Sequence, residues 1–267
     1  MSRITATERL NLIRMKNRPT VNDYIPLIFN HFMEMHGDRL FGDDAAIMGG
    51  IATLNSIPVT VLAQVKGRNL EENKKSNFSM PHPEGYRKTL RLAKEAEKFH
   101  RPIICLVDTP GAFCGVEAEK RGQGEAIAKN LMEFMTLRTP IISVVLGEGG
   151  SGGALALAVC DELAMLENAL YSVISPRGFA SILWKDPGRE KEACELMRIT
   201  AEDLVEFGVC DRIISEAVGG AHCDAKMTAS NLGEYLFDAV SRFSKIDIDR
   251  MLENRYNKFR KIGMFTE

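Results

Sequence analysis

The stretch Ile141–Ala158 reads IISVVLGEGGSGGALALA and changes character twice. It begins with β-branched residues, passes through five glycines within seven positions, and resumes with a run of alanine and leucine. β-Branched residues favour strands and an Ala/Leu run favours a helix, so the pattern predicts a strand, a tight turn and a helix. Such a turn leaves backbone N–H groups unpaired at the positive end of a helix, with no side chains to obstruct a bound oxygen atom. We therefore expect a site for negative charge.

Four interpretations fit this glycine turn. Gly147, Gly149 and Gly152 have the G-x-G-x-x-G spacing of a dinucleotide site. Gly149, Ser151 and Gly153 have the G-x-S-x-G spacing of a hydrolase nucleophile elbow. The third interpretation is an oxyanion hole made by backbone amides alone, and the fourth is a turn that only lets a helix pack closely on a sheet. The turn by itself does not decide among them.

Composition narrows the class of protein. The chain has 267 residues, 45% of them hydrophobic and 26% charged, with a net charge of −2, which is ordinary for a globular protein and gives no overall bias toward nucleic acid or membrane. The six cysteines form no C-x-x-C pair and the five histidines are scattered, so we predict no metal site in this chain. With no signal peptide or transmembrane run in the sequence, we expect a cytoplasmic protein that does not associate with membranes.

The remaining chain alternates helical and strand patterns, which predicts an α/β domain with a largely parallel sheet. We expect a single domain over residues 1–267, with helical segments at 1–36 and 227–261. Within that plan a two-residue turn at Asn55-Ser56 joins the strands of a hairpin, and a basic loop covers 66–78. The other predicted helices cover 4–17, 21–35, 86–99, 117–137, 175–184, 189–197 and 201–207. The predicted strands cover 102–107, 140–146, 162–166, 169–174 and 209–214.

The loop Asp108–Ala112 follows the strand before the glycine turn. Since both loops follow parallel strands, we expect them to lie on the same side of the sheet. A nucleoside triphosphatase is improbable because the chain has no G-x-x-x-x-G-K-[ST]. A dinucleotide site normally follows the first strand, whereas several strands precede this turn. The hydrolase order is met by Ser151, later aspartates and His222, but the turn carries far more glycine than a nucleophile elbow requires.

Five motifs together carry a resemblance to a known family. In chain order, the sequence resembles the carboxyltransferase alpha subunits of bacterial acetyl-CoA carboxylase over residues 18–223. The motifs are GDRLFGDDAA at 37–46, MPHPEGYRK at 80–88, DTPGA at 108–112, GEGGSGGAL at 147–155 and YSVISP at 171–176.

The resemblance implies the crotonase-like (ClpP/crotonase) fold of repeated ββα units and an enzyme built from several proteins. It implies a beta subunit that bears a zinc ribbon, an α2β2 heterotetramer, a biotin carboxyl carrier protein, and biotin carboxylase as the ATP-binding component of the complex. The implied reaction moves a carboxyl group from carboxybiotin on the carrier to acetyl-CoA, forming malonyl-CoA for fatty acid biosynthesis. No metal is implied in this subunit.

The resemblance also implies roles for residues of the glycine turn. The backbone amides of Gly152 and Gly153 would hold the biotin carbonyl oxygen, because loss of carboxylate leaves negative charge there and fixed donors stabilise an oxyanion. Neighbouring positions would shape the substrate-binding site: Gly111, Ala112, Gly149, Gly150 and Ser151. Basic residues would contact CoA phosphates or the carrier, although a solvated surface explains them equally well: Lys66, Arg68, Arg87 and Lys88.

The sequence departs from the usual family pattern at several positions. Ser79 stands where glycine is usual, Cys114 where proline is usual, Arg177 where glutamate is expected, and Ala217-Val218 where Glu-Pro or a similar pair is usual. These changes bear on substrate preference rather than on the fold. Two alternatives stay open: a stand-alone crotonase-like acyl-CoA hydrolase or isomerase, and a non-catalytic paralogue that serves only in assembly.

Overall fold

The computed structural model describes residues 4–263. Across these residues one eight-stranded sheet has the order β1-β2-β3-β4-β5-β6-β8, with β7 paired to the end of β5. β1, β2 and β3 are antiparallel, and every pairing from β3 to β8 is parallel. The strands are β1 (Asn30–Glu34), β2 (Ile47–Leu54), β3 (Ile57–Gln64), β4 (Ile103–Thr109), β5 (Ile141–Gly150), β6 (Glu162–Leu166), β7 (Leu170–Ser172) and β8 (Arg212–Ile214).

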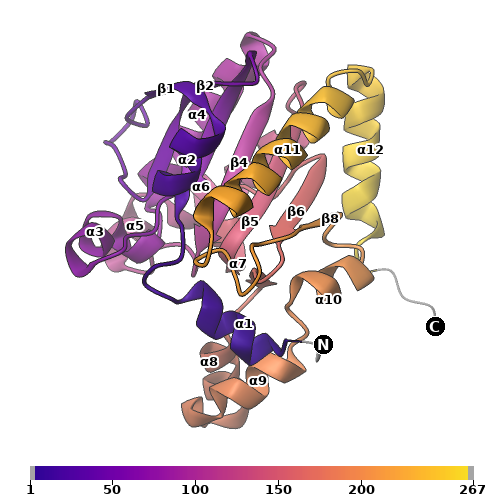
Figure 1. Cartoon of the computed structure of the whole chain (residues 1–267). Helices are drawn as coiled ribbons and strands as arrows, with labels where there is room; N and C mark the ends of the chain where they lie inside the picture. Colours follow the sequence, from indigo (N-terminus) through magenta and orange to yellow (C-terminus); the bar gives the residue numbers. More distant parts are fainter. Residues whose placement is uncertain (1–3, 264–267) are drawn as a thin grey trace.

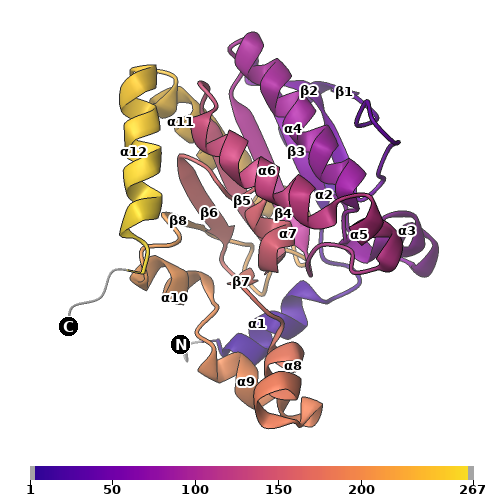
Figure 2. The ribbon, with the colours of Figure 1, turned by 180° about the vertical axis from the view of Figure 1, so that it is seen from behind.

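Helices cover both faces of the sheet. α2 (Val21–Ile28) and α11 (Ala225–Phe243) pack on one face (Figure 1), and α4 (Pro83–Lys98) and α6 (Gln123–Thr136) pack on the other (Figure 2). α12 (Ile248–Lys261) stands at the side of the sheet that carries β8. β4 is buried along its whole length, which explains the apolar run from Ile103 to Val107. The helices predicted for 227–261 are α11 and α12.

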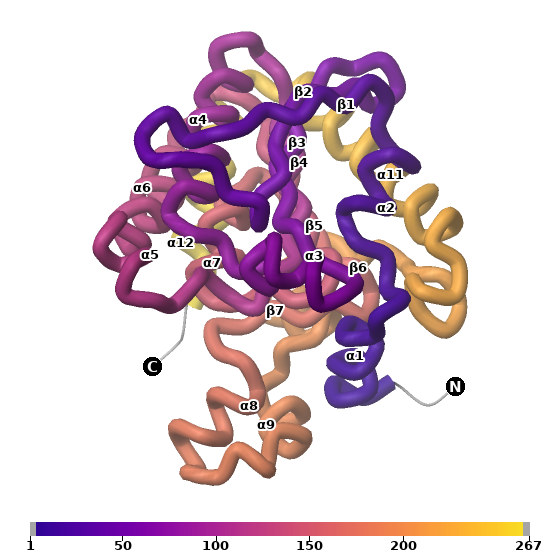
Figure 3. Tube along the Cα trace, turned by 90° about the vertical axis from the view of Figure 1, so that its left-hand side faces the viewer, coloured from indigo at the N-terminus to yellow at the C-terminus, as the bar shows by residue number. Residues whose placement is uncertain are grey.

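A smaller group of helices extends beyond the carboxyl ends of the parallel strands. α1 (Ala6–Ile13), α8 (Pro176–Phe179) and α9 (Glu190–Leu196) lie together there, well apart from the helical layers (Figure 3). Their contacts form a separate small core that includes Leu10, Cys194 and Ile199. The remaining α-helices are short: α3 (Leu70–Lys75), α5 (Val116–Lys120), α7 (Ser151–Leu155) and α10 (Ala201–Glu206).

The sequence predicts several elements correctly. The hairpin turn at Asn55 and Ser56 has φ of 45° and 70°, as a two-residue turn between right-twisted strands requires. The sheet is largely parallel, and the loops after β4 and β5 lie side by side, because a Cβ on Gly150 would meet the Pro110 carbonyl oxygen. The predicted domain limits include residues 1–3 and 264–267, which lie outside the described residues.

Other predictions are wrong at their boundaries. The predicted helix 21–35 ends at Ile28, and Asn30–Glu34 forms β1 instead. Pro26 lies inside α2 and has no N–H to continue the helix, while the open edge of β2 accepts a new strand. The predicted helix 117–137 is two helices, since Gly122 takes a left-handed φ of 83° between them. The predicted loop at 66–78 contains the short helix α3.

Candidate active site

The glycine turn and the loop after β4 are in direct contact. A Cβ on Gly150 would lie 2.1 Å from the Pro110 carbonyl oxygen, and a Cβ on Gly153 would lie 2.4 Å from the Ala112 nitrogen. No side chain fits at such distances, so glycine is required at both positions for this approach. The structure thus brings together Gly111, Ala112, Gly150 and Gly153, as expected.

The N-terminal end of α7 leaves its amides available. α7 has five residues and begins at Ser151, directly after β5. The first N–H groups of a helix have no intrahelical acceptor, so the amides of Gly152 and Gly153 have no partner within α7. Ser151 has a φ of 53°, in the left-handed region that side chains rarely adopt. This conformation turns the chain sharply from strand to helix and leaves Ser151 exposed.

Gly152 faces a cavity of about 460 Å³. The atom nearest to a Cβ placed on Gly152 is Ile127 Cγ2 at 3.6 Å, so this glycine has room where Gly153 has none. The walls come mainly from α7, β6, β7, α10 and α12, with Lys258 as the one charged residue among the lining residues. The apolar residues that line the cavity are Leu155, Ala158, Leu163, Tyr171, Val173, Leu204, Val209, Phe259 and Ile262.

Gly149 and Gly150 face a different cavity, of about 380 Å³. This second cavity is more polar, and Arg14, Glu148 and Arg177 contribute to its walls. Four of the predicted site residues therefore divide into two groups, while Gly111 and Ala112 line neither cavity. Gly152 and Ser151 border the apolar cavity, whereas Gly149 and Gly150 border the polar one.

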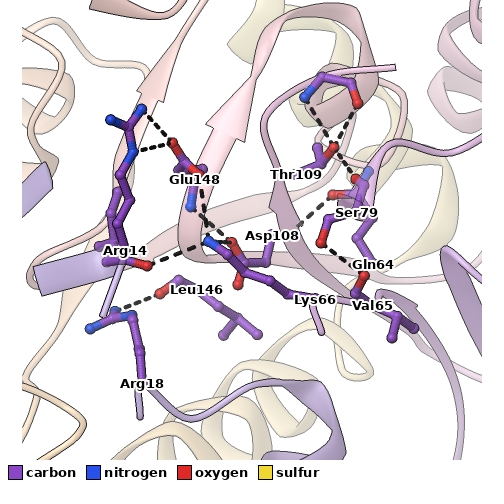
Figure 4. A network of polar contacts seen from close by, with 12 residues as sticks. Arg14, Arg18, Gln64, Val65, Lys66, Ser79, Asp108, Thr109, Leu146 and Glu148 are labelled. Atoms are coloured by element: carbon purple, nitrogen blue, oxygen red, sulfur yellow. Dashed lines mark hydrogen bonds and ion pairs between the residues drawn. The ribbon is translucent and has the colours of Figure 1, made fainter. Parts of the chain in front are cut away.

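A partly buried ionic network supports the strand that leads into the turn (Figure 4). Asp108 accepts a hydrogen bond of 3.0 Å from the Glu148 backbone nitrogen, and a Cβ on Gly147 would lie 2.7 Å from the same carboxylate. The Lys66 ammonium lies 3.5 Å from Asp108 Oδ1 and 3.4 Å from Glu148 Oε2. Burial opposes the charge of Lys66, but the two carboxylates raise its pKa above the ordinary value. Lys66 therefore stays protonated and holds the ends of β4 and β5 together.

The four predicted phosphate contacts occupy very different environments. Lys66 and Arg68 border one cavity of about 470 Å³, and Arg68 is exposed. Arg87 is half-buried and donates to Asp38 at 2.8 Å. The prediction for Lys88 is wrong, because its side chain is fully buried and its ammonium donates to Asp43 at 2.6 Å. A solvent-borne phosphate cannot reach it without unpacking α4.

The hydrolase interpretation has no support from the geometry. Within residues 4–263 no hydrogen bond joins the Ser151 hydroxyl to a histidine or a carboxylate. His222 lies beside Cys223, with its Nε2 3.5 Å from the thiol. Lys258 shares the cavity with Ser151. Burial opposes the charge of Lys258, but the Asp211 carboxylate beside its ammonium outweighs burial, so the pKa of Lys258 is raised and it is a poor base.

The described residues offer neither a metal site nor a membrane span. Between residues 4 and 263 there is no cluster of three or more His, Cys, Asp or Glu side chains able to hold a metal ion. No helix in this part of the chain combines the length and the apolar composition needed to cross a bilayer.

Sequence reasoning missed the side chains that hold the turn. Gln64 is fully buried at the end of β3 and donates to the Gly153 carbonyl oxygen at 2.8 Å. Arg18 donates to the Leu146 carbonyl oxygen at 2.7 Å and pairs with Glu216. The sequence shows only that Gln64 is a polar residue at the end of a largely apolar strand, and its partner Gly153 lies 89 residues away. Arg18 gives no signal, because its partners lie more than a hundred residues away in sequence.

Comparison with solved structures defines the class of fold. The chain resembles a transcarboxylase 12S subunit with a TM-score of 0.72 and 19% identity, over 91% of this chain and 45% of that one. It also resembles a chain of a Pseudomonas malonate decarboxylase hetero-dimer, with a TM-score of 0.64 and 20% identity, over 82% of this chain and 91% of that one. These likenesses define an α/β protein with the crotonase-like fold of carboxyltransferases.

Sequence comparison gives the family. The model of the family described as acetyl co-enzyme A carboxylase carboxyltransferase-like matches residues 1–263, and the chain belongs to this family. The acetyl-coenzyme A carboxylase carboxyl transferase subunit alpha of Clostridium acetobutylicum is 62% identical, over 99% of this chain and 96% of that protein. The subunit of the same name from Listeria welshimeri is 53% identical, over 99% of this chain and 83% of that protein. A Clostridium tetani protein named as subunits beta/alpha is 54% identical, over 99% of this chain and 46% of that protein.

Proposed function

We infer that this chain is the carboxyltransferase alpha subunit of an acetyl-CoA carboxylase. The Clostridium acetobutylicum relative that carries this name is 62% identical over 99% of this chain. The reaction transfers a carboxyl group from carboxybiotin to acetyl-CoA, which gives malonyl-CoA for fatty acid biosynthesis. A beta subunit completes the enzyme, and the Clostridium tetani protein, named for both subunits, supports that pairing.

We propose that Gly152 and Gly153 form the oxyanion site of this subunit. Carboxybiotin supplies the carboxyl group, and the two backbone N–H groups donate to the ureido oxygen of the biotin ring. The single observation that carries the proposal is the contact between the two loops, which leaves these amides at a helix N-terminus beside open space at Gly152. One backbone donor of this kind stabilises a transition state by about 3–4 kcal/mol. No side-chain base from this subunit is required.

The surroundings of the turn suit that ligand. The cavity beside Gly152 is lined by apolar side chains, which match the hydrocarbon and thioether parts of a biotin ring. Gly111 and Ala112 form the wall behind the turn, and Ser151 lies at the cavity mouth. We propose that Gly149 and Gly150 contribute from the polar cavity, and that Arg68 contacts CoA phosphates or the carrier.

The proposed assembly follows the family. It is an α2β2 heterotetramer whose beta subunit bears the zinc ribbon, and it works with a biotin carboxyl carrier protein and biotin carboxylase in the cytoplasm. Within it, this chain acts as a single carboxyltransferase domain.

Co-expression with a beta subunit and a carboxyl-exchange assay between malonyl-CoA and free biotin test the proposal. We expect activity only when both subunits are present. A Gly152→Val variant has room to fold, because the nearest atom to its Cβ is 3.6 Å away, but its side chain would obstruct the cavity and lower kcat roughly 100-fold or more. Gly124→Val is the matched control, since a Cβ on this exposed helical glycine meets no atom within 4 Å. Full exchange activity in the Gly152→Val enzyme would overturn the proposed site.

A further inference from the structure

We infer that Gln64 is a positioning residue for the carboxyltransferase reaction, because its side-chain amide ties the glycine turn to the end of β4. This inference rests on the proposed function of the turn. Gln64 is fully buried, so its side chain touches neither solvent nor a substrate. Any effect it has on turnover must therefore act through the backbone that it holds.

The first observation is what Gln64 replaces at the turn. In a continuing α-helix the Gly153 carbonyl oxygen would accept a hydrogen bond from the nitrogen of Leu157. Here the Leu157 nitrogen donates instead to the Ala154 carbonyl oxygen at 3.0 Å, which closes α7 with a tighter turn. Gln64 Nε2 donates to the Gly153 carbonyl oxygen at 2.8 Å and takes the place of the missing donor.

The second observation is the other end of the same side chain. Gln64 Oε1 accepts a hydrogen bond of 3.2 Å from the Asp108 backbone nitrogen at the end of β4. The loop that follows is held by Thr109, whose hydroxyl donates to the Gly111 carbonyl oxygen at 2.7 Å. One buried amide therefore ties α7 to the end of β4, directly before the loop that meets Gly153 at Ala112. Figure 4 shows Gln64 beside Asp108.

The hydrogen bonds of Gln64 are needed at this turn because glycine residues leave the backbone free to adopt many conformations. Four of the five residues from Gly149 to Gly153 are glycines, and each can adopt many more φ/ψ combinations than another residue. The Gly152 carbonyl oxygen is fixed within α7 by the Ala156 nitrogen at 3.0 Å. Gln64 fixes the next peptide, which joins Gly153 to Ala154. With the peptides on both sides of the Gly153 Cα held, the Gly153 N–H keeps one direction. A displacement of about 1 Å of a reacting group can cost roughly 100-fold in rate.

Two substitutions separate positioning from packing. Gln64→Met keeps the length of the side chain and removes both hydrogen bonds. Gln64→Glu keeps an acceptor for Asp108 but loses the donor to Gly153 when it is ionised. Since burial raises the pKa of a carboxyl group, the carboxyl group introduced by Gln64→Glu can be protonated at lower pH and then donate again. Thr139→Val is the matched control, because its buried hydroxyl donates at 2.9 Å to the Arg101 carbonyl oxygen at the opposite ends of β4 and β5.

The experiment uses the complete enzyme with its beta subunit, assayed by malonyl-CoA and biotin exchange from about pH 5.5 to about pH 8.5 alongside thermal unfolding. We expect Gln64→Met to lower kcat at least tenfold with KM for malonyl-CoA within twofold, because the lost interaction acts in the transition state. We expect Thr139→Val to lower the unfolding temperature by about as much as Gln64→Met does, but to leave kcat unchanged. The kcat of Gln64→Glu should rise, relative to the natural enzyme, as the pH falls.

Two results would overturn the inference: a Gln64→Met enzyme with the kcat of the Thr139→Val control, or a Gln64→Glu enzyme whose relative kcat does not change with pH. If Gln64→Met does not fold, the pH profile of Gln64→Glu decides alone. Gly152→Val is assayed in parallel. If Gly152→Val is inactive while both Gln64 variants keep full kcat, only the role of Gln64 fails. If Gly152→Val is fully active, the proposed oxyanion site fails.

Discussion

Replacing Gly153 by alanine perturbs one of the two closest backbone approaches in the candidate site. The added Cβ would lie 2.4 Å from the Ala112 nitrogen, 2.6 Å from the Gly111 carbonyl carbon and 2.9 Å from the Tyr86 hydroxyl. Two of these atoms are backbone, so they cannot rotate away as a flexible side chain would. The separation of 2.4 Å has to grow by about 0.6 Å to reach even 3.0 Å, below which Cβ atoms are essentially never found. The two loops must therefore move apart.

The size of the expected effect follows from that displacement. Overpacking a well-filled interior costs about 1–3 kcal/mol, which corresponds to a fall of about 2–12 °C in unfolding temperature for a chain of this size. Moving the amides by more than half an ångström should lower kcat by roughly 10- to 100-fold, since a shift of about 1 Å costs roughly 100-fold. The loss in kcat should exceed what the loss in stability explains at 25 °C, where the protein stays folded.

Calorimetry and the exchange assay on the reconstituted enzyme measure both effects. Gly152→Ala is the control, because its Cβ would make only an ordinary contact of 3.6 Å and should leave the unfolding temperature within about 2 °C of the natural protein. A Gly153→Ala enzyme with natural stability and natural kcat would refute the reasoning, because it would mean that the loops do not meet as described.

Three further predictions concern stability. Arg255→Met should lower the free energy of unfolding by about 3–5 kcal/mol in urea titrations, because it leaves the buried Asp161 carboxylate without its partner; a loss below about 1 kcal/mol would contradict this. Gly122→Ala should cost about 1–2 kcal/mol in the same titration, because its φ of 83° is left-handed, and an unchanged midpoint would contradict that conformation. Burial opposes the charge of Glu216, but hydrogen bonds from Arg18 outweigh burial and lower the pKa of Glu216 in the folded protein. The ionised Glu216 therefore stabilises the fold above the pKa of an unfolded glutamate, about 4.3. This stabilisation is lost as the pH falls through the lower pKa of the folded state. Urea titrations between about pH 7 and about pH 3 should therefore show a shallower decline for Glu216→Gln than for the natural chain, and parallel curves would contradict the pairing.

Local sequence patterns predict much of this fold, because most of its elements obey local rules. The strand predicted for 140–146 is β5, and the pair Asn55-Ser56 forms the hairpin turn, since both depend on intrinsic backbone preferences. β5 continues to Gly150, because its first glycines pair with β4 and β7, so the turn begins later than predicted. The helix expected at 21–35 is wrong beyond Ile28, because an open strand edge recruits residues that a helical pattern also fits. Tertiary pairing overrides local propensity there.

Some features of the candidate site could likewise be predicted from the sequence, and others could not. The contact between Gly111, Ala112 and the glycine turn could be expected from the order of strands alone, because both loops follow parallel strands. The burial of Lys88 could not be expected from the sequence. Its neighbours in sequence are polar, and its burial depends on Asp43, which lies 45 residues away. The role of Gln64 likewise depends on Gly153, 89 residues away. Long-range polar contacts leave little trace in a single sequence.

The central claim is that the amides of Gly152 and Gly153 donate to the ureido oxygen of biotin. A crystal structure of the reconstituted enzyme with biotin bound measures this directly. We predict that the ureido oxygen lies about 2.7–3.1 Å from both backbone nitrogens. A ureido oxygen bound elsewhere, with those two N–H groups directed away from the biotin ring, would contradict the claim.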